Sequence, residues 1–64
     1  MLNIDIYNGE KPNKNTLGAT ANFNDLTATY WGYIYRLDNG EIIGDYTADS
    51  SEEITKAFRV AWKS

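Results

Sequence analysis

The residues of this sequence that could do chemistry are six carboxylates that follow one another without a base between them. A pair of carboxylates serves as general acid and base in glycosidases, but such a pair needs a cleft and one acid with a raised pKa. A chain of 64 residues offers no evident cleft for such a pair. The six acids are Asp38, Glu41, Asp45, Asp49, Glu52 and Glu53.

Other catalytic and cofactor chemistry lacks its usual residues. The sequence has neither cysteine nor histidine, which removes the thiol nucleophile, the disulfide and the commonest general base and metal ligand. Asp38, Asn39 and Glu41 supply oxygen atoms, but the spacing of a calcium-binding EF-hand loop is missing. The five glycines are scattered, so no phosphate-binding loop is expected. We therefore predict a non-enzymatic protein with no catalytic residues, metal or cofactor.

The length and the charge of the chain limit the classes of protein to which it can belong. The chain forms a single domain (1–64), and a domain of this size buries only about 60% of its unfolded surface. No apolar run approaches the roughly 20 residues that span a bilayer, and the first ten residues do not resemble a signal peptide. We expect a cytoplasmic protein without a membrane partner. The net charge of −3 argues against tight binding to duplex phosphates.

Hydrophobic patterning predicts strands along most of the chain. Leu2, Ile4 and Ile6 alternate with polar residues, which is typical of a half-buried strand over 2–7. A loop is expected at 8–18, and a weak strand at 19–23. Aromatic and β-branched residues favour a strand at 27–37. A further strand is expected at 41–48.

Asn39 and Gly40 predict a two-residue type I′ turn between the last two strands. In that register Asp38 faces Glu41 and Trp31 faces Ala48, and the like-charge pair at the turn is unfavourable. The register gives the sheet two faces. The expected core face holds Trp31, Tyr33, Tyr35, Leu37, Ile42, Tyr46 and Ala48. The other face holds Tyr30, Ile34, Arg36, Ile43, Asp45, Thr47 and Asp49.

The last segment predicts a helix over 51–63. Ser50 and Glu53 have the spacing of a capping box. The apolar stripe consists of Ile54, Ala57, Phe58, Ala61 and Trp62. The opposite side of the helix carries a basic ridge of Lys56, Arg59 and Lys63. The expected fold is α+β, a small antiparallel sheet of three or four strands packed on one C-terminal helix.

Two binding functions are consistent with these elements. In the first, the six acids form an acidic hairpin–helix edge that docks on the basic groove of a host protein, with Tyr30 and Tyr35 as anchors. In the second, the aromatic sheet face stacks on nucleic-acid bases. Phosphates would then be contacted by Arg36, Lys56, Arg59 and Lys63. Either function suits a monomer or a homodimer.

Residues 35–64, "YRLDNGEIIGDYTADSSEEITKAFRVAWKS", resemble part of small acidic phage-encoded anti-CRISPR proteins. The shared pattern is a strand, an Asn-Gly turn, a strand, an acidic Ser-rich joint and a helix. The layout is also similar to that of small phage inhibitors of host RNA polymerase. The resemblance implies a phage or mobile-element protein that acts in host takeover, by binding and inhibiting a host nucleic-acid-handling protein. The arm-binding domains of phage integrases are similar in layout too, and they imply DNA binding through the sheet.

Overall fold

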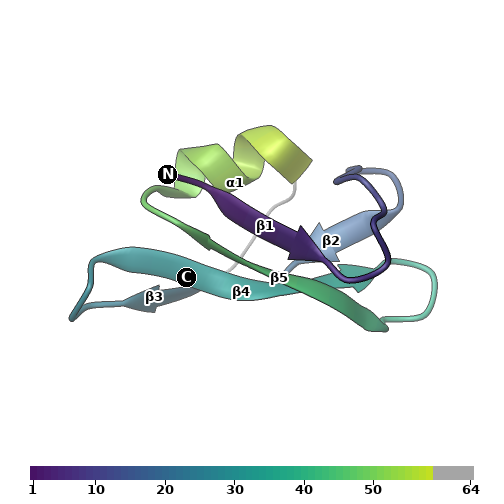
Figure 1. Cartoon of the computed structure of the whole chain (residues 1–64), viewed down its shortest axis with the longest axis horizontal. Coiled ribbons are helices and arrows are strands. Elements are labelled where there is room, and N and C mark those ends of the chain that lie inside the picture. The colour runs from purple at the N-terminus through teal and green to yellow at the C-terminus, as the bar shows by residue number, and fades with distance from the viewer. Residues whose placement is uncertain (59–64) are drawn as a thin grey trace.

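The computed structural model describes residues 1–58, which form five antiparallel strands and one helix. The sheet has the order β1-β5-β4-β2, and β3 pairs with another part of β4. Helix α1 lies across one face of the sheet (Figure 1). The predicted α+β fold, a small antiparallel sheet packed on one C-terminal helix, is confirmed, with five strands instead of three or four. The elements are β1 (Asn3–Ile6), β2 (Leu17–Ala19), β3 (Asn22–Asn24), β4 (Thr29–Arg36), β5 (Ile42–Ala48) and α1 (Ser51–Phe58).

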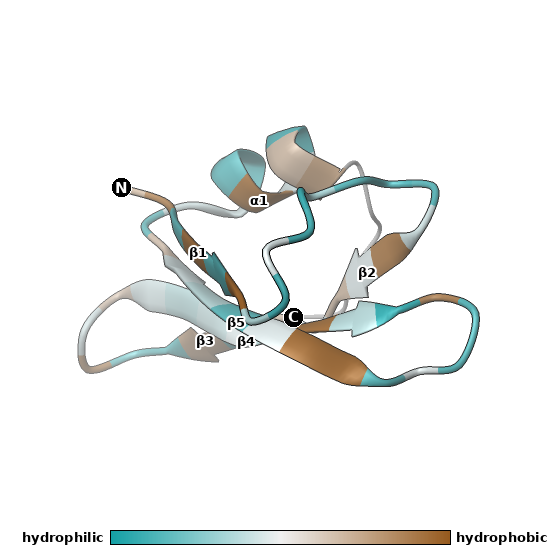
Figure 2. Ribbon diagram, turned by 45° about the vertical axis from the view of Figure 1, so that its right-hand side comes forward, coloured by the Kyte–Doolittle hydropathy of each residue, from teal (hydrophilic) through white to brown (hydrophobic). Residues whose placement is uncertain are grey.

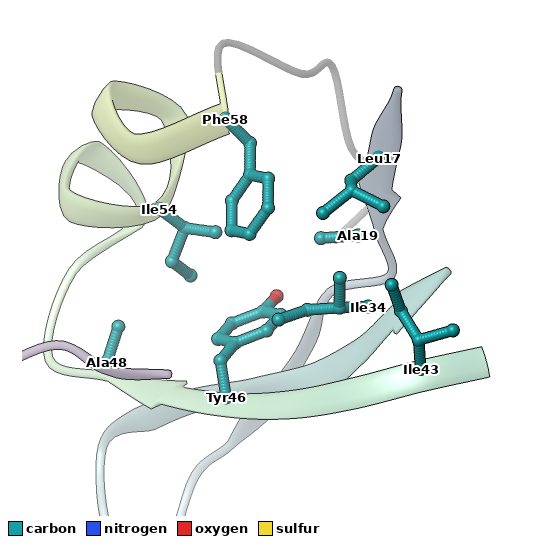
Figure 3. Close-up of a cluster of buried hydrophobic side chains, with 8 residues drawn as sticks. All are labelled: Leu17, Ala19, Ile34, Ile43, Tyr46, Ala48, Ile54 and Phe58. Carbon is teal, nitrogen blue, oxygen red and sulfur yellow. The ribbon is translucent and has the colours of Figure 1, made fainter. Parts of the chain in front are cut away.

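The hydrophobic core lies between α1 and the sheet. Ile54 and Phe58 project from the helix towards Tyr46 and Ile34 of the sheet, while Leu17 closes the side (Figure 3). The Tyr46 hydroxyl donates a hydrogen bond to the Thr20 backbone carbonyl, so its buried polar atom has a partner. The complete buried cluster is Leu17, Ala19, Ile34, Ile43, Tyr46, Ala48, Ile54 and Phe58.

Helix α1 begins where the sequence predicts. Ser50 immediately precedes it, and the Ser50 hydroxyl lies 3.5 Å from the Glu53 carboxylate. The burial of Ile54 and Phe58 and the partial burial of Ala57 confirm this part of the apolar stripe. The rest of the predicted helix, 59–63, lies outside the described residues, and so do Ala61 and Trp62 of the stripe.

The strand expected at 19–23 is longer than predicted and interrupted. β2 and β3 pair with β4 in one continuous register, from Leu17 opposite Arg36 to Asn24 opposite Thr29. Between them the Thr20 hydroxyl accepts a hydrogen bond from the Tyr33 backbone N–H. This side-chain bond replaces a regular ladder bond and breaks the strand. The expected loop at 8–18 was therefore wrong at its end, because residues 17 and 18 belong to β2.

The predicted two-residue turn at Asn39-Gly40 is wrong. The Gly40 N–H donates to the Arg36 carbonyl at 2.8 Å, and the Arg36 N–H donates to the Glu41 carbonyl at 2.8 Å. The loop therefore comprises residues 37–40, and Gly40 adopts a left-handed conformation with φ of 73°. The Asn39 side chain accepts from the Glu41 N–H, which stabilises this wider loop. Asp38 consequently does not face Glu41.

The wider loop alone would shift the β4–β5 register by two residues, but an irregularity in the ladder reduces the shift to one residue and so exchanges the faces of β4. Ala48 lies opposite Tyr30 rather than Trp31, and an irregularity falls between Ile34 and Tyr35. A one-residue shift exchanges the two faces of a strand, because side chains alternate. The expected core face was correct for Tyr46 and Ala48. It was wrong for four exposed residues, Trp31, Tyr33, Leu37 and Ile42, and for the buried Ile34 and Ile43. It was also wrong for Tyr35, which lies on the face away from the core, and for Tyr30, which packs against the core.

Candidate functional site

The sheet face turned away from α1 is the candidate site, and we call it the open face. Strand alternation and register assign its residues. Leu2, Ile4 and Ile6 pack against the core, so the odd-numbered residues of β1 point the other way. Figure 2 shows this alternation as hydrophobic and hydrophilic bands along β1. The open face includes Asn3, Asp5, Tyr7, Asn22, Trp31, Tyr33, Tyr35, Ile42, Asp45 and Thr47.

Two carboxylates and a tyrosine form one row across the middle of the open face. Asp5 of β1 lies directly opposite Asp45 of β5, and Asp45 lies directly opposite Tyr33 of β4. Residues that face each other in this way have Cβ atoms about 5 Å apart. Both aspartates are exposed. The sheet therefore holds two negative charges side by side on its surface.

Tyr7 joins this row through its hydroxyl, which donates a hydrogen bond to Asp45 Oδ2 at 2.8 Å. That hydrogen bond raises the pKa of Tyr7, and the charges of Asp45 and Asp5 and the nearby Tyr33 add to the effect. The four side chains thus form a single electrostatic cluster. The bond also fixes the orientation of the Asp45 carboxylate and leaves its Oδ1 atom free of a hydrogen bond within residues 1–58.

Trp31 and Tyr33 stand next to this row with their rings at right angles. Their centroids are 6.1 Å apart and their planes meet at 85°. Trp31 is 39% exposed and Tyr33 44% exposed. An edge-to-face pair is favourable in itself, but it does not offer two parallel surfaces on which successive bases could stack. The pair instead presents an aromatic corner beside the carboxylates.

The six acids singled out in the sequence do not lie together. Asp38 lies in the loop at one end of β5 and Glu41 follows it, while Asp49, Glu52 and Glu53 lie at the other end. The strand between them spans about 20 Å at roughly 3.3 Å per residue. Asp45 lies on the open face in mid-strand. The topology therefore divides the acidic run into three places.

Most of these acids already have partners. Arg36 donates to both Asp38 oxygens, at 3.2 Å from Nε and 3.1 Å from Nη2, and this pairing lowers the pKa of Asp38. The Met1 amino group contacts Asp49 and lies 4.0 Å from Glu53. Glu41 and Glu52 are exposed.

The two tyrosines expected as anchors lie on opposite faces of β4. Tyr30 packs against the core cluster, with its ring centroid 4.9 Å from that of Phe23. Tyr35 covers Gly18 of β2, where an added Cβ would lie 2.7 Å from the tyrosine ring. Tyr35 therefore belongs to the open face, and Tyr30 does not.

The expected cationic residues are not grouped on the open face. Arg36 is held between Asp38 and Glu10, with Nη1 3.2 Å from Glu10 Oε1. Lys56 is exposed on α1. Arg59 and Lys63, the other residues of the basic ridge, lie outside the described residues. Among residues 1–58, the positions on the open face hold no lysine or arginine.

Sequence reasoning did not single out Asp5 and Tyr7 of the open face, and it favoured a core position for Trp31 and Tyr33. The alternation of residues 2–7 already carried the signal for Asp5 and Tyr7, since it sets them opposite the isoleucines. Trp31 and Tyr33 were expected in the core because the ladder irregularity between Ile34 and Tyr35 does not follow from the sequence pattern.

Other site types find little support in the described residues. A surface depression of about 470 Å³ is lined by Tyr7, Asn8, Arg36, Glu41, Ile42 and Ile43. Within residues 1–58, no three potential ligands gather to hold a metal ion, and no helix there is long and apolar enough to cross a membrane. Comparisons of the chain with protein-family models, with curated proteins and with solved structures found no match.

Proposed function

We propose that this chain is a non-enzymatic binding protein whose open face docks on a basic surface of a partner protein. One observation carries the proposal: Asp5 and Asp45 face each other on an exposed surface, beside exposed aromatic rings. Facing like charges on a sheet are unfavourable, and a basic partner would relieve this repulsion. The neighbouring Trp31 and Tyr33 are of the residue types that dominate protein interfaces.

We place the docking surface on the open face instead of the hairpin–helix edge. At that edge Asp38 is neutralised by Arg36, and the acids at the far end lie beside the Met1 amino group. A carboxylate that is already paired gains less from a new cation. The partner we propose is a host nucleic-acid-handling protein, because grooves that hold nucleic acid are basic and an acidic occupant would compete with it.

Direct binding of nucleic acid is the weaker alternative. Asp5 and Asp45 would repel phosphates approaching the aromatic rings, and Arg36 is already held by two carboxylates. Titration with single- and double-stranded oligonucleotides at low salt separates the two functions. Saturable binding that survives the removal of both aspartate charges would favour the nucleic-acid function.

The test of the proposed function compares charge reversal at two sites. A partner is captured from host lysate, identified by mass spectrometry and purified, and its affinity is measured for D5K/D45K and for the control E52K/D38K. Both variants change the net charge equally. We expect D5K/D45K to abolish binding and the control to retain most of it, with an affinity that falls as salt rises. An equal loss of affinity in both variants, or an affinity that does not change with salt, would overturn the proposal.

A further inference from the structure

We infer that the open face holds one arginine side chain of its partner, between the paired carboxylates and the aromatic corner. This inference rests on the proposed function and names the chemical group that the site recognises. It starts from the charges. Among residues 1–58, the Asp5 carboxylate has no hydrogen-bond or ion-pair partner, and the Asp45 carboxylate has the Tyr7 hydroxyl alone.

The first step concerns what the two carboxylates can bind. Tyr7 occupies Oδ2 of Asp45 and leaves the other oxygen available, and Asp5 lies directly opposite on the neighbouring strand. A cation placed between the strands would interact with both carboxylates at once. A cation with several donors spread over about 5 Å, the separation of facing residues, can donate a hydrogen bond to each carboxylate.

The second step concerns the rings. Tyr33 follows Asp45 in the same row, and Trp31 stands at 85° to it. Rings arranged in this way attract a cation through their faces, and exposed cation–π contacts are well known for arginine. The site therefore combines two acceptors on one side with an aromatic wall on the other.

The third step distinguishes arginine from lysine. A guanidinium is planar and has five N–H donors in a fixed fork. It can therefore donate hydrogen bonds to carboxylates while its plane stacks on an aromatic ring. A lysine ammonium is a compact, strongly hydrated point charge and does not satisfy both requirements together. The geometry of the open face therefore favours arginine over lysine.

The experiment uses short N-acetylated, C-amidated peptides of arginine or of lysine with equal length. Their affinities for the whole chain are measured by isothermal titration calorimetry at low salt. We expect the arginine peptide to bind about two- to fivefold more tightly, the range expected for a cation on an exposed ring. D5N, D45N and W31L should each remove this preference. The control E52Q removes one charge elsewhere and should keep it. Circular dichroism confirms that every variant is folded.

The possible outcomes separate this inference from the proposed function. Equal affinity for both peptides, with the same loss in E52Q as in D45N, would overturn the arginine site and leave docking by general charge attraction. If neither peptide binds at low salt, both the arginine site and the basic docking surface are wrong. A preference for arginine that disappears in D5N and D45N but persists in E52Q supports both.

Discussion

Asp5 and Asp45 face each other across β1 and β5, and both side chains are exposed on the same side of the sheet. The sequence suggested a like-charge pair at the hairpin turn, between Asp38 and Glu41. That pair is absent because the loop comprises residues 37–40, so that Glu41 pairs with Arg36 instead of Asp38. A repulsive pair of facing carboxylates is therefore present, but it lies in the middle of the open face and not at the hairpin turn.

The first prediction concerns the stability cost of this pair. D5N should raise the free energy of unfolding by a few tenths of a kcal/mol, because it removes repulsion between facing residues. E52Q should lower it by a similar amount, since Glu52 lies in the first turn of α1, where negative charge is favourable. Urea denaturation at low salt measures both. The gain in D5N should shrink at about 1 M salt. Destabilisation by D5N at low salt would contradict the account.

The second prediction concerns two loops that end in the same conformation. Gly40 closes the loop at 37–40 with φ of 73°, and Ala28 closes the loop at 25–28 with φ of 54°. Left-handed backbone costs a residue with a Cβ about 1–2 kcal/mol. G40A should therefore destabilise the protein by about 1 kcal/mol, and A28G should stabilise it by somewhat less, since glycine loses more entropy on folding. Thermal denaturation tests both, and a shift of the same sign in the two variants would contradict the assigned loops.

The third prediction compares two buried glycines of the sheet. A Cβ at Gly32 would overlap the Thr20 backbone carbonyl, whereas a Cβ at Gly18 would meet the Tyr35 ring. Backbone cannot move without breaking the β2–β4 ladder, but a partly exposed ring can rotate away. G32A should cost about 3 kcal/mol or more and G18A about 1 kcal/mol, within the range for overpacking. Chemical denaturation measures the loss of stability in each variant. A loss in G18A that equals or exceeds the loss in G32A would show that the strand interruption at Thr20 is misplaced.

The fourth prediction concerns alkaline pH. Burial raises the pKa of Tyr46 to about 12, above the ordinary value of 10. The unfolded chain therefore releases this proton at lower pH than the folded chain, so the contribution of Tyr46 to stability should be constant below pH 10 and fall between pH 10 and 12. Y46F should lose about 1 kcal/mol at neutral pH, because its hydrogen bond to Thr20 is gone. Denaturation at a series of pH values should show a shallower alkaline decline in Y46F. An equal alkaline loss of stability in Y46F and in the unaltered protein would show that a group other than Tyr46 causes it.

Much of the fold follows from local patterns in the sequence. The alternation of Leu2, Ile4 and Ile6 locates β1, and the spacing of Ile54 and Phe58 locates the described part of α1. These patterns record which side of an element is apolar, and burial of that side dominates folding. The two short strands were harder to predict, because the break between them depends on a hydrogen bond from Tyr33 to Thr20, residues far apart in sequence.

The open face could not be predicted because it depends on register. The longer loop and the ladder irregularity between Ile34 and Tyr35 together placed Ile34 in the core and exposed Trp31 and Tyr33. The predicted register and the observed register both place aromatic or β-branched residues in the core, so the composition of the strand does not distinguish between them. The pairing of Asp5 with Asp45 joins residues 40 positions apart, and only the assembled sheet brings them together.

The most direct test of the open face as a docking surface is a nuclear magnetic resonance titration of the whole chain with the arginine peptide. We predict that the largest amide shifts occur at Asp5, Asp45, Tyr33 and the Trp31 indole N–H, and that D5N/D45N abolishes them. Shifts concentrated at Glu52 and Glu53, or spread evenly over all acidic residues, would contradict the account.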